Sequence, residues 1–242
     1  MPTNVGWRFR RECFNSMAMT DTTETDAAGS GALPPRLVQG YRAFRSGRLV
    51  TEQSRYRELA EEGQAPETMV IGCCDSRVAP EVIFDAKPGE LFVARNIASL
   101  VPPYTPDGRQ RSVSAALEFA VQALRVKHIV VLGHAQCGGI RAVAEPGEPL
   151  SPGDFIGSWM EIFAPAAKTL RATGKFASQA DYIRQLEQRA IETTLENLMT
   201  FPCVRILVER GKLQLHGAYF GVATGDLSLR DPKTGVFEKI AG

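Results

Sequence analysis

The sequence predicts an α/β fold in which a mostly parallel central β-sheet is flanked by helices. Two observations lead to this prediction: short apolar runs end in turn residues, and segments with helical periodicity separate those runs. A strand, a crossover helix and a second strand on this scale form a parallel pair. A length of 242 residues, of which 44% are hydrophobic, allows one enlarged domain with a substantial core.

Two short helices are expected near the start of the chain. Leu37, Tyr41, Phe44 and Leu49 recur near helical spacing, and a second helical stretch covers residues 56–62. Both segments are too weakly apolar to form a core alone. We therefore expect these N-terminal helices to pack on a partner subunit.

The central part of the sequence alternates strands and helices. Apolar strands are expected at residues 68–72, 91–94 and 128–132. Helices are expected at residues 112–124, with Ser112 as the cap, and at residues 140–144.

The C-terminal part continues the same pattern. Amphipathic helices are expected at residues 154–170 and 178–200, and strands at residues 213–217 and 227–229. Residues 204–208 are ambiguous by periodicity alone. No internal repeat is present, and residues 36–242 are expected to form a single domain.

Residues 1–35 are expected to be a flexible leader. Residues 18–34 are rich in threonine, aspartate, alanine, glycine and serine, which disfavours a packed core. Residues 1–16 lack the apolar segment of a secretory signal. Met17 and Met19 are alternative starts of the chain.

The charge balance and the apolar runs argue against two classes of partner. Lysine and arginine number 28 against 27 aspartate and glutamate residues, so no bulk attraction to nucleic acid or to an anionic membrane is expected. The longest apolar runs, such as residues 129–132, are far shorter than the roughly 20 residues of a bilayer-spanning helix.

The cysteines form no even-numbered framework for disulfides. They are Cys13, Cys73, Cys74, Cys137 and Cys203. Two of them are adjacent, which does not suit a relaxed disulfide bond. Reduced thiols are typical of the cytoplasm, which is therefore the expected location.

Three metal-binding side chains stand at the ends of predicted strands. Cys73 follows one apolar strand, and His134 and Cys137 follow another. Because parallel strands bring their carboxyl ends to one edge of a sheet, these side chains can converge on one ion. Two cysteines and one histidine leave a fourth position open, which is the pattern of catalytic rather than structural zinc.

Asp75 and Arg77 supply groups that a catalytic zinc site needs. The Asp75 carboxylate can accept a hydrogen bond from zinc-bound water, and the Arg77 guanidinium can hold that carboxylate in place. Each residue alone has a simpler interpretation, since an isolated cysteine is usually a small buried hydrophobe and Asp-x-Arg a surface ion pair. Their joint position at strand ends favours the site. His128 and His216, inside predicted strands, are expected to be structural, as are Cys13, Cys74 and Cys203.

These motifs closely resemble those of the β-class carbonic anhydrases. The family carries Cys-x-Asp-x-Arg, here at residues 73–77, and His-x-x-Cys-Gly-Gly, here at residues 134–139. The likeness extends through residues 88–93, 95–98 and 101–104 and covers roughly residues 36–235. It implies one Zn²⁺ per chain and the reversible hydration of CO₂ to bicarbonate and a proton by zinc-bound hydroxide. It also implies a helix at residues 204–208.

The resemblance further implies a substrate site. Gln64 matches a glutamine that donates to the substrate oxygen, Phe92 and Ile97 match an apolar wall, and the Gly138 amide would lie beside the substrate. In the family the glutamine and the phenylalanine cross a dimer interface. A homodimer, or a tetramer or octamer built from dimers, is therefore expected.

One subgroup of the family holds a non-catalytic bicarbonate between tryptophan, arginine and tyrosine side chains. The matching positions here are Val70, Arg95 and Phe119, so only the arginine is present. We therefore expect the plant-like, open type, with Asp75 paired with Arg77.

Two alternatives stay open at this point. Carbonyl sulfide and carbon disulfide hydrolases resemble the same fold and the same zinc ligands. An inactive zinc or redox module, with Cys73 and Cys74 as a switch, is the alternative from a different class.

Overall fold

The computed structural model describes residues 33–144 and 153–241. The expected leader lies outside the described residues except for residues 33–35, as do Cys13, Met17 and Met19. Contacts divide the chain into two compact units, Met1–Gly63 and Gln64–Gly242, and each is described by itself. The expectation of one domain over residues 36–242 stays a prediction. Over the described ranges, no helix combines the length and the apolar character needed to cross a bilayer.

The first unit contains two helices, α1 (Pro35–Ser46) and α2 (Arg48–Glu62). Gly47 separates them, so the apolar residues of the first expected helix divide between both. The rings of Phe44 and Tyr56 meet edge to face, with centroids 6.0 Å apart. Neither helix buries a residue. The expected packing of these helices on a partner subunit stays a prediction.

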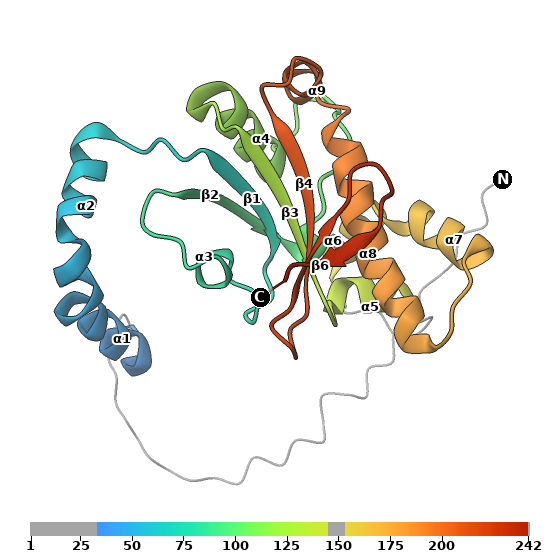
Figure 1. Cartoon of the computed structure of the whole chain (residues 1–242), viewed down its shortest axis with the longest axis horizontal. Coiled ribbons are helices and arrows are strands. Elements are labelled where there is room, and N and C mark those ends of the chain that lie inside the picture. The colour runs from blue at the N-terminus through green and yellow to red at the C-terminus, as the bar shows by residue number, and fades with distance from the viewer. Residues whose placement is uncertain (1–32, 145–152, 242) are drawn as a thin grey trace, which may run out of the picture. The chain divides into compact units, whose positions relative to one another are not determined.

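The second unit is built on a mixed sheet with the strand order β2-β1-β3-β4-β5-β6 (Figure 1). The strands are β1 (Thr68–Cys73), β2 (Leu91–Asn96), β3 (His128–His134), β4 (Gln214–Phe220), β5 (Leu227–Arg230) and β6 (Phe237–Lys239). The pairs among β2, β1, β3 and β4 are parallel, and those of β4 with β5 and of β5 with β6 are antiparallel. The predicted α/β fold with a mostly parallel sheet is confirmed.

The helices of the second unit connect or follow the strands along the chain. They are α3 (Pro80–Ile83), η2 (Ile97–Ser99), α4 (Ser112–Glu118), η3 (Phe119–Leu124), α5 (Gly138–Ala144), α6 (Asp154–Met160), α7 (Ala164–Thr173), α8 (Gln179–Leu198) and α9 (Pro202–Glu209). Helix α9 confirms the helix that the family resemblance implied at residues 204–208.

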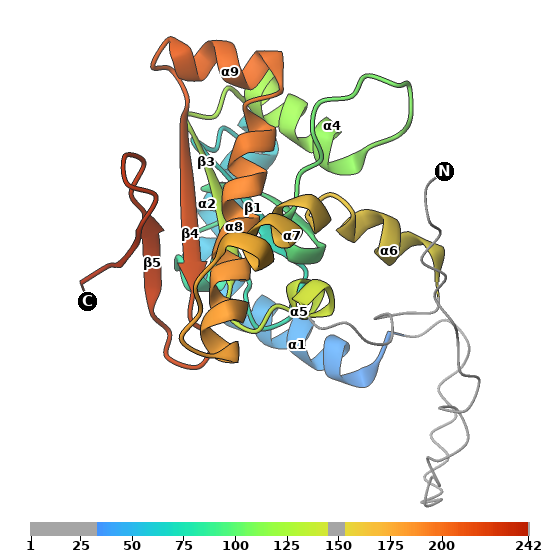
Figure 2. The ribbon, with the colours of Figure 1, turned by 90° about the vertical axis from the view of Figure 1, so that its right-hand side faces the viewer.

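The main core lies between one face of the sheet and helices that include α4, η3, α8 and α9. Alternate residues of the strands, such as Met69, Ile71 and Ile129, point to this face and are fully buried. Leu117 of α4 and Ile191 of α8 cover them. Figure 2 shows α8 lying alongside β4, and α5 and α7 both contact α8. Helix α8 thus packs against β3, the strand that ends at His134.

Two helix predictions need correction. The segment expected as one helix at residues 112–124 changes from an α-helix to a π-helix at Phe119. Ser112 is the first helical residue rather than the cap; Arg111 occupies the cap position and no side chain caps this helix. The segment expected as one helix at residues 154–170 is interrupted after Met160, and a new helix begins at Ala164 with Pro165 in its first turn, a position that suits proline.

Candidate metal centre and substrate site

Cys73, His134 and Cys137 meet at the carboxyl ends of β1 and β3. Cys73 and His134 are the last residues of these strands, and Cys137 immediately precedes α5. One ligand atom from each residue lies within 4.8 Å of the other two. All three side chains are buried. The structure thus brings together the three ligands that the sequence predicts, because β1 and β3 are adjacent parallel strands.

The His134 ring is fixed with one nitrogen directed at this cluster. Nδ1 lies 2.9 Å from the carbonyl oxygen of Ala135, and a proton on Nδ1 makes this a hydrogen bond. The lone pair of Nε2 is then available. Nε2 is buried and lacks a hydrogen-bond partner among the residues that the structure describes. A buried polar atom without a partner is costly, so this nitrogen suits a ligand.

The two sulfurs lie close enough to share a proton. The hydrogen bond between them lowers the pKa of Cys73 and raises the pKa of Cys137. A divalent cation in place of that proton would be held by two thiolates and one neutral imidazole. Zinc favours this donor set, so the residues present fit the expected ion.

Asp75 and Arg77 form a two-pronged ion pair beside the cluster. Nε and Nη2 of Arg77 donate to the two carboxylate oxygens of Asp75 at 2.9 and 2.7 Å, and the Arg77 backbone N–H donates to Oδ1 at 3.0 Å. The hydrogen bonds from Arg77 hold the pKa of Asp75 well below its usual range. Oδ2 of Asp75 lies 3.9 Å from Nε2 of His134. An ionised, oriented oxygen therefore stands next to the free nitrogen.

Arg95 braces the turn that carries these residues. Its Nε donates to the Cys73 carbonyl and its Nη2 to the Asp75 carbonyl, both at 2.8 Å. This role of Arg95 was not predicted from the sequence, where the residue stood only as a match to the bicarbonate pocket of one subgroup. The signal available in the sequence was a cation within an otherwise apolar strand.

Ile97 and Gly138 lie beside the metal cluster. Gly138 opens α5 directly after Cys137, and a Cβ built on Gly138 would meet no atom within 4 Å. A Cβ on Gly139 would lie 2.8 Å from Cγ2 of Ile97, so Ile97 packs against the start of α5. Ile97 is 37% exposed. The backbone at Gly138 therefore borders open space next to an apolar side chain.

Gln64 and Phe92 lie toward the opposite end of the sheet. Phe92 pairs with Met69 near the start of β1, whereas Cys73 pairs with Asn96 at its end. The five steps from Thr68 to Cys73 span about 16 Å at about 3.3 Å per residue. Gln64 is exposed and precedes β1 by four residues. The structure of one chain thus does not bring Gln64 or Phe92 to that chain's own cluster.

Phe92 instead contacts Phe119, the position that matches the tyrosine of the bicarbonate pocket. The two ring centroids are 5.8 Å apart. Val70, the position that matches the tryptophan, is buried in a small apolar cluster with Leu132 and Ala218. Apolar side chains therefore occupy both positions.

The remaining described cysteines and histidines stay outside the metal cluster. Cys74 is exposed and Cys203 is half-buried. His128 and His216 face each other, with Nδ1 of the first 3.1 Å from Nε2 of the second. These positions agree with the structural roles expected for them.

Comparisons with known proteins agree with the geometry. The family model described as carbonic anhydrase matches residues 68–227. The chain is 35% identical to beta carbonic anhydrase 3 of Arabidopsis thaliana over 196 residues, which cover 80% of this chain and 75% of the relative.

Solved structures show the same fold. The β-carbonic anhydrase CcaA is 28% identical with a TM-score of 0.74, and the match covers 86% of this chain and 92% of CcaA. A β-carbonic anhydrase from Sordaria macrospora, described as tetrameric, is 28% identical with a TM-score of 0.68, over 84% and 96% of the two chains. With its metal-binding triad and its Asp75–Arg77 pair in place, this chain belongs to the β-class carbonic anhydrase family.

Proposed function

We propose that the protein catalyses the reversible hydration of CO₂ to bicarbonate and a proton, with one Zn²⁺ per chain held by Cys73, His134 and Cys137. The observation that carries this proposal is the buried three-donor cluster directly beside the carboxylate that Arg77 holds. A structural zinc site is closed by four protein ligands and has no use for an oriented carboxylate. The inactive zinc or redox module is therefore not favoured.

Asp75 and Arg77, beside the cluster, have separate roles in the proposed reaction. Bound zinc supplies the nucleophile by lowering the pKa of a water molecule to about 7. Oδ2 of Asp75 is placed to accept a hydrogen bond from that water and to turn a lone pair of the water oxygen toward the carbon of CO₂. Arg77 keeps this acceptor ionised and fixed, because its guanidinium engages both carboxylate oxygens.

CO₂ needs an apolar surface and a few donors for its developing negative charge. Ile97 offers the apolar surface at the start of α5, and the open space on the side of the Gly138 Cα where a Cβ would stand leaves room there for a small substrate. The relatives, which are carbonic anhydrases, support CO₂ as the substrate over the sulfur-containing alternatives.

We infer that a complete centre needs a second copy of this chain. Gln64 and Phe92 lie toward the end of the strands opposite their own chain's cluster, so a role for them in catalysis requires the centre of another chain. The tetrameric relative supports an assembly built from such pairs. A mass measurement in solution by light scattering tests this inference, and a monomer with full activity would contradict it.

The proposed state of the site is the open one, in which Asp75 pairs with Arg77 rather than with zinc. The two-pronged ion pair supports this state, as do the apolar side chains at Val70 and Phe119. A crystal structure at neutral pH with the Asp75 carboxylate bonded to zinc would contradict it. We also propose a cytoplasmic location, which the free thiols of Cys73, Cys74, Cys137 and Cys203 support.

Stopped-flow CO₂ hydration by the zinc-loaded protein tests the proposed function. We expect clear catalysis by the wild type and a loss of about 100-fold or more in Asp75→Asn, since this variant keeps the size of the side chain but removes its charge. The variant should retain zinc. Background rates in the zinc-loaded wild type would overturn the proposal, and carbon disulfide hydrolysis under the same conditions would then identify the related hydrolase activity.

A further inference from the structure

Glu187 is a buried carboxylate on α8 that the proposed reaction does not use. Its side chain belongs to the stripe of α8 that faces the sheet, together with Leu186, Ala190 and Ile191. The residue is only 3% exposed. A carboxylate in this position is costly unless both of its oxygens are satisfied.

Both oxygens of Glu187 have partners. Oε1 accepts a hydrogen bond from the backbone N–H of Cys137 at 3.1 Å. Oε2 accepts one from the hydroxyl of Tyr219 on β4 at 2.7 Å. The carboxylate thus links α8 and β4 to the backbone of one zinc ligand.

Glu187 also shares a cavity with the metal cluster. The cavity has a volume of about 10 Å³ and is lined by His134, Cys137, Glu187, Ser99 and Gly133, among others. This volume is at the limit for a single water molecule. Little space is therefore left for Cys137 to move away from its position while Glu187 is in place.

We propose that Glu187 is a positioning residue for the metal centre. It holds the Cys137 amide, and through this amide it keeps the Cys137 sulfur in the position from which it can bind zinc. Tyr219 in turn fixes the orientation of the carboxylate. The inference rests on zinc binding by the cluster, but not on any rate of CO₂ hydration. Groups that orient metal ligands typically change metal affinity by about 10- to 100-fold when they are removed.

Glu192 provides a matched control on the same helix. Its Oε1 accepts a hydrogen bond from Nε of Arg230 at 3.1 Å, and its Oε2 accepts one from Arg189. Glu192→Ala therefore removes a partly buried glutamate from α8 and its hydrogen bonds with Arg189 and Arg230. It removes no contact with a predicted zinc ligand.

The test is the rate at which the zinc-loaded protein loses its metal to a chromophoric chelator at neutral pH. We expect Glu187→Ala to lose zinc about 10- to 100-fold faster than the wild type. Glu187→Gln should restore most of the retention, because its amide oxygen still accepts from the Cys137 N–H. Tyr219→Phe should give a smaller acceleration, and Glu192→Ala the wild-type rate.

The absorption spectra of the cobalt-substituted proteins give a second readout, which a general loss of folding stability would not change. The cobalt–thiolate absorption bands should shift in Glu187→Ala and stay unchanged in Glu192→Ala. Wild-type zinc loss together with wild-type bands in folded Glu187→Ala would overturn the proposal. If Glu187→Ala does not fold, Tyr219→Phe decides, and zinc loss at the wild-type rate in that variant would contradict the role of the carboxylate. A wild-type protein that binds zinc but does not hydrate CO₂ would leave this measurement intact.

Discussion

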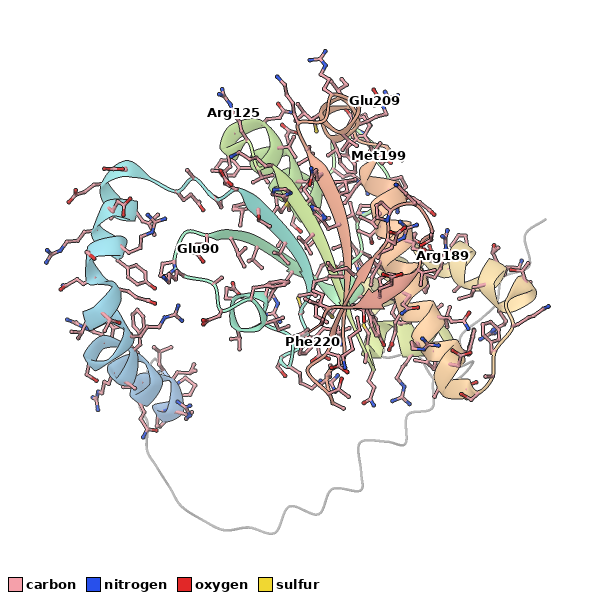
Figure 3. All side chains as sticks on the ribbon, viewed as in Figure 1. Glu90, Arg125, Arg189, Met199, Glu209 and Phe220 are labelled. Atoms are coloured by element: carbon pink, nitrogen blue, oxygen red, sulfur yellow. The ribbon has the colours of Figure 1, made fainter. Side chains whose placement is uncertain are left out.

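The two ends of the parallel strands use similar side chains in opposite ways. At the amino ends, His128 lies against His216, and Lys127 forms an ion pair with Glu67. At the carboxyl ends, Nε2 of His134 is buried and has no hydrogen-bond partner within residues 33–144 and 153–241. Figure 3 labels Phe220, the register partner of His134, near the carboxyl end and Arg125 near the amino end of β3.

This difference shows where reactivity is located in the fold. A histidine in a strand says little by itself, because His128 and His134 are the first and last residues of the same strand. His128 and His216 at the amino ends contact each other, whereas Nε2 of His134 at the carboxyl end is buried with no hydrogen-bond partner among the described residues. Unsatisfied buried atoms of this kind are typical of functional sites.

The largest effect that the comparison predicts is on metal content. His134→Gln should reduce bound zinc from about one ion per chain to almost none and lower CO₂ hydration by more than about 100-fold. The matched variant at the other end, His216→Gln, should keep its zinc and its activity. Metal analysis of both purified proteins checks this, and equal zinc contents would break the comparison.

A smaller effect is expected for the ion pair beside the cluster. Arg77→Lys should retain zinc but lower kcat/KM by about 10- to 100-fold, because lysine cannot engage both oxygens of Asp75 in the same plane. Arg111 offers a control, since it holds Asp107 in a comparable two-pronged pair that includes no residue of the cluster. Arg111→Lys should leave the kinetics unchanged, and a loss as large as that of Arg77→Lys would show that the effect is not local.

Packing near the carboxyl ends gives a prediction about stability. A Cβ on Gly133 would lie 2.6 Å from two side-chain carbons of buried Ile191, so Gly133→Ala should lower the free energy of unfolding by about 1–3 kcal/mol. On the neighbouring strand, the nearest atom to a Cβ on Gly72 is Cγ of Pro80 at 3.4 Å. Gly72→Ala should therefore stay within about 0.5 kcal/mol of the wild type. Urea unfolding at fixed zinc concentration measures both variants.

The smallest effect concerns pH at the amino ends. Burial, with a contribution from neighbouring His128, lowers the pKa of His216. Below about pH 6.5, His216 therefore binds a proton in the unfolded chain but stays neutral in the folded chain. The free energy of unfolding consequently falls as the pH drops. Urea unfolding at stepped pH values should show a shallower decline in His216→Gln than in the wild type. Identical declines would contradict this assignment.

The strands and the metal ligands were predictable from local pattern. Strands β1 and β3 are buried, and each contains a continuous apolar run in the sequence. Such a run is by itself almost enough to predict the strand. The strand ends then fixed the positions of Cys73 and His134. Short elements without such a run, α3 and β6, were missed.

The supporting residues were not predictable, because their roles arise only from tertiary contacts. Glu187 falls on the apolar stripe of α8, four residues before Ile191, which could have marked it as unusual. Nothing in the sequence indicates that its partner is the Cys137 amide, 50 positions away. The same holds for Arg95, whose carbonyl partners lie on another strand and the turn that follows it.

The separation of Gln64 and Phe92 from their own chain's cluster has a consequence for regulation by abundance. In the proposed arrangement, a single chain contains every residue of the active site but cannot assemble a complete one by itself. Turnover per molecule would then rise steeply as newly made chains accumulate past the point at which they associate. The quantity of protein in the cell, and not merely its presence, would set when bicarbonate production begins.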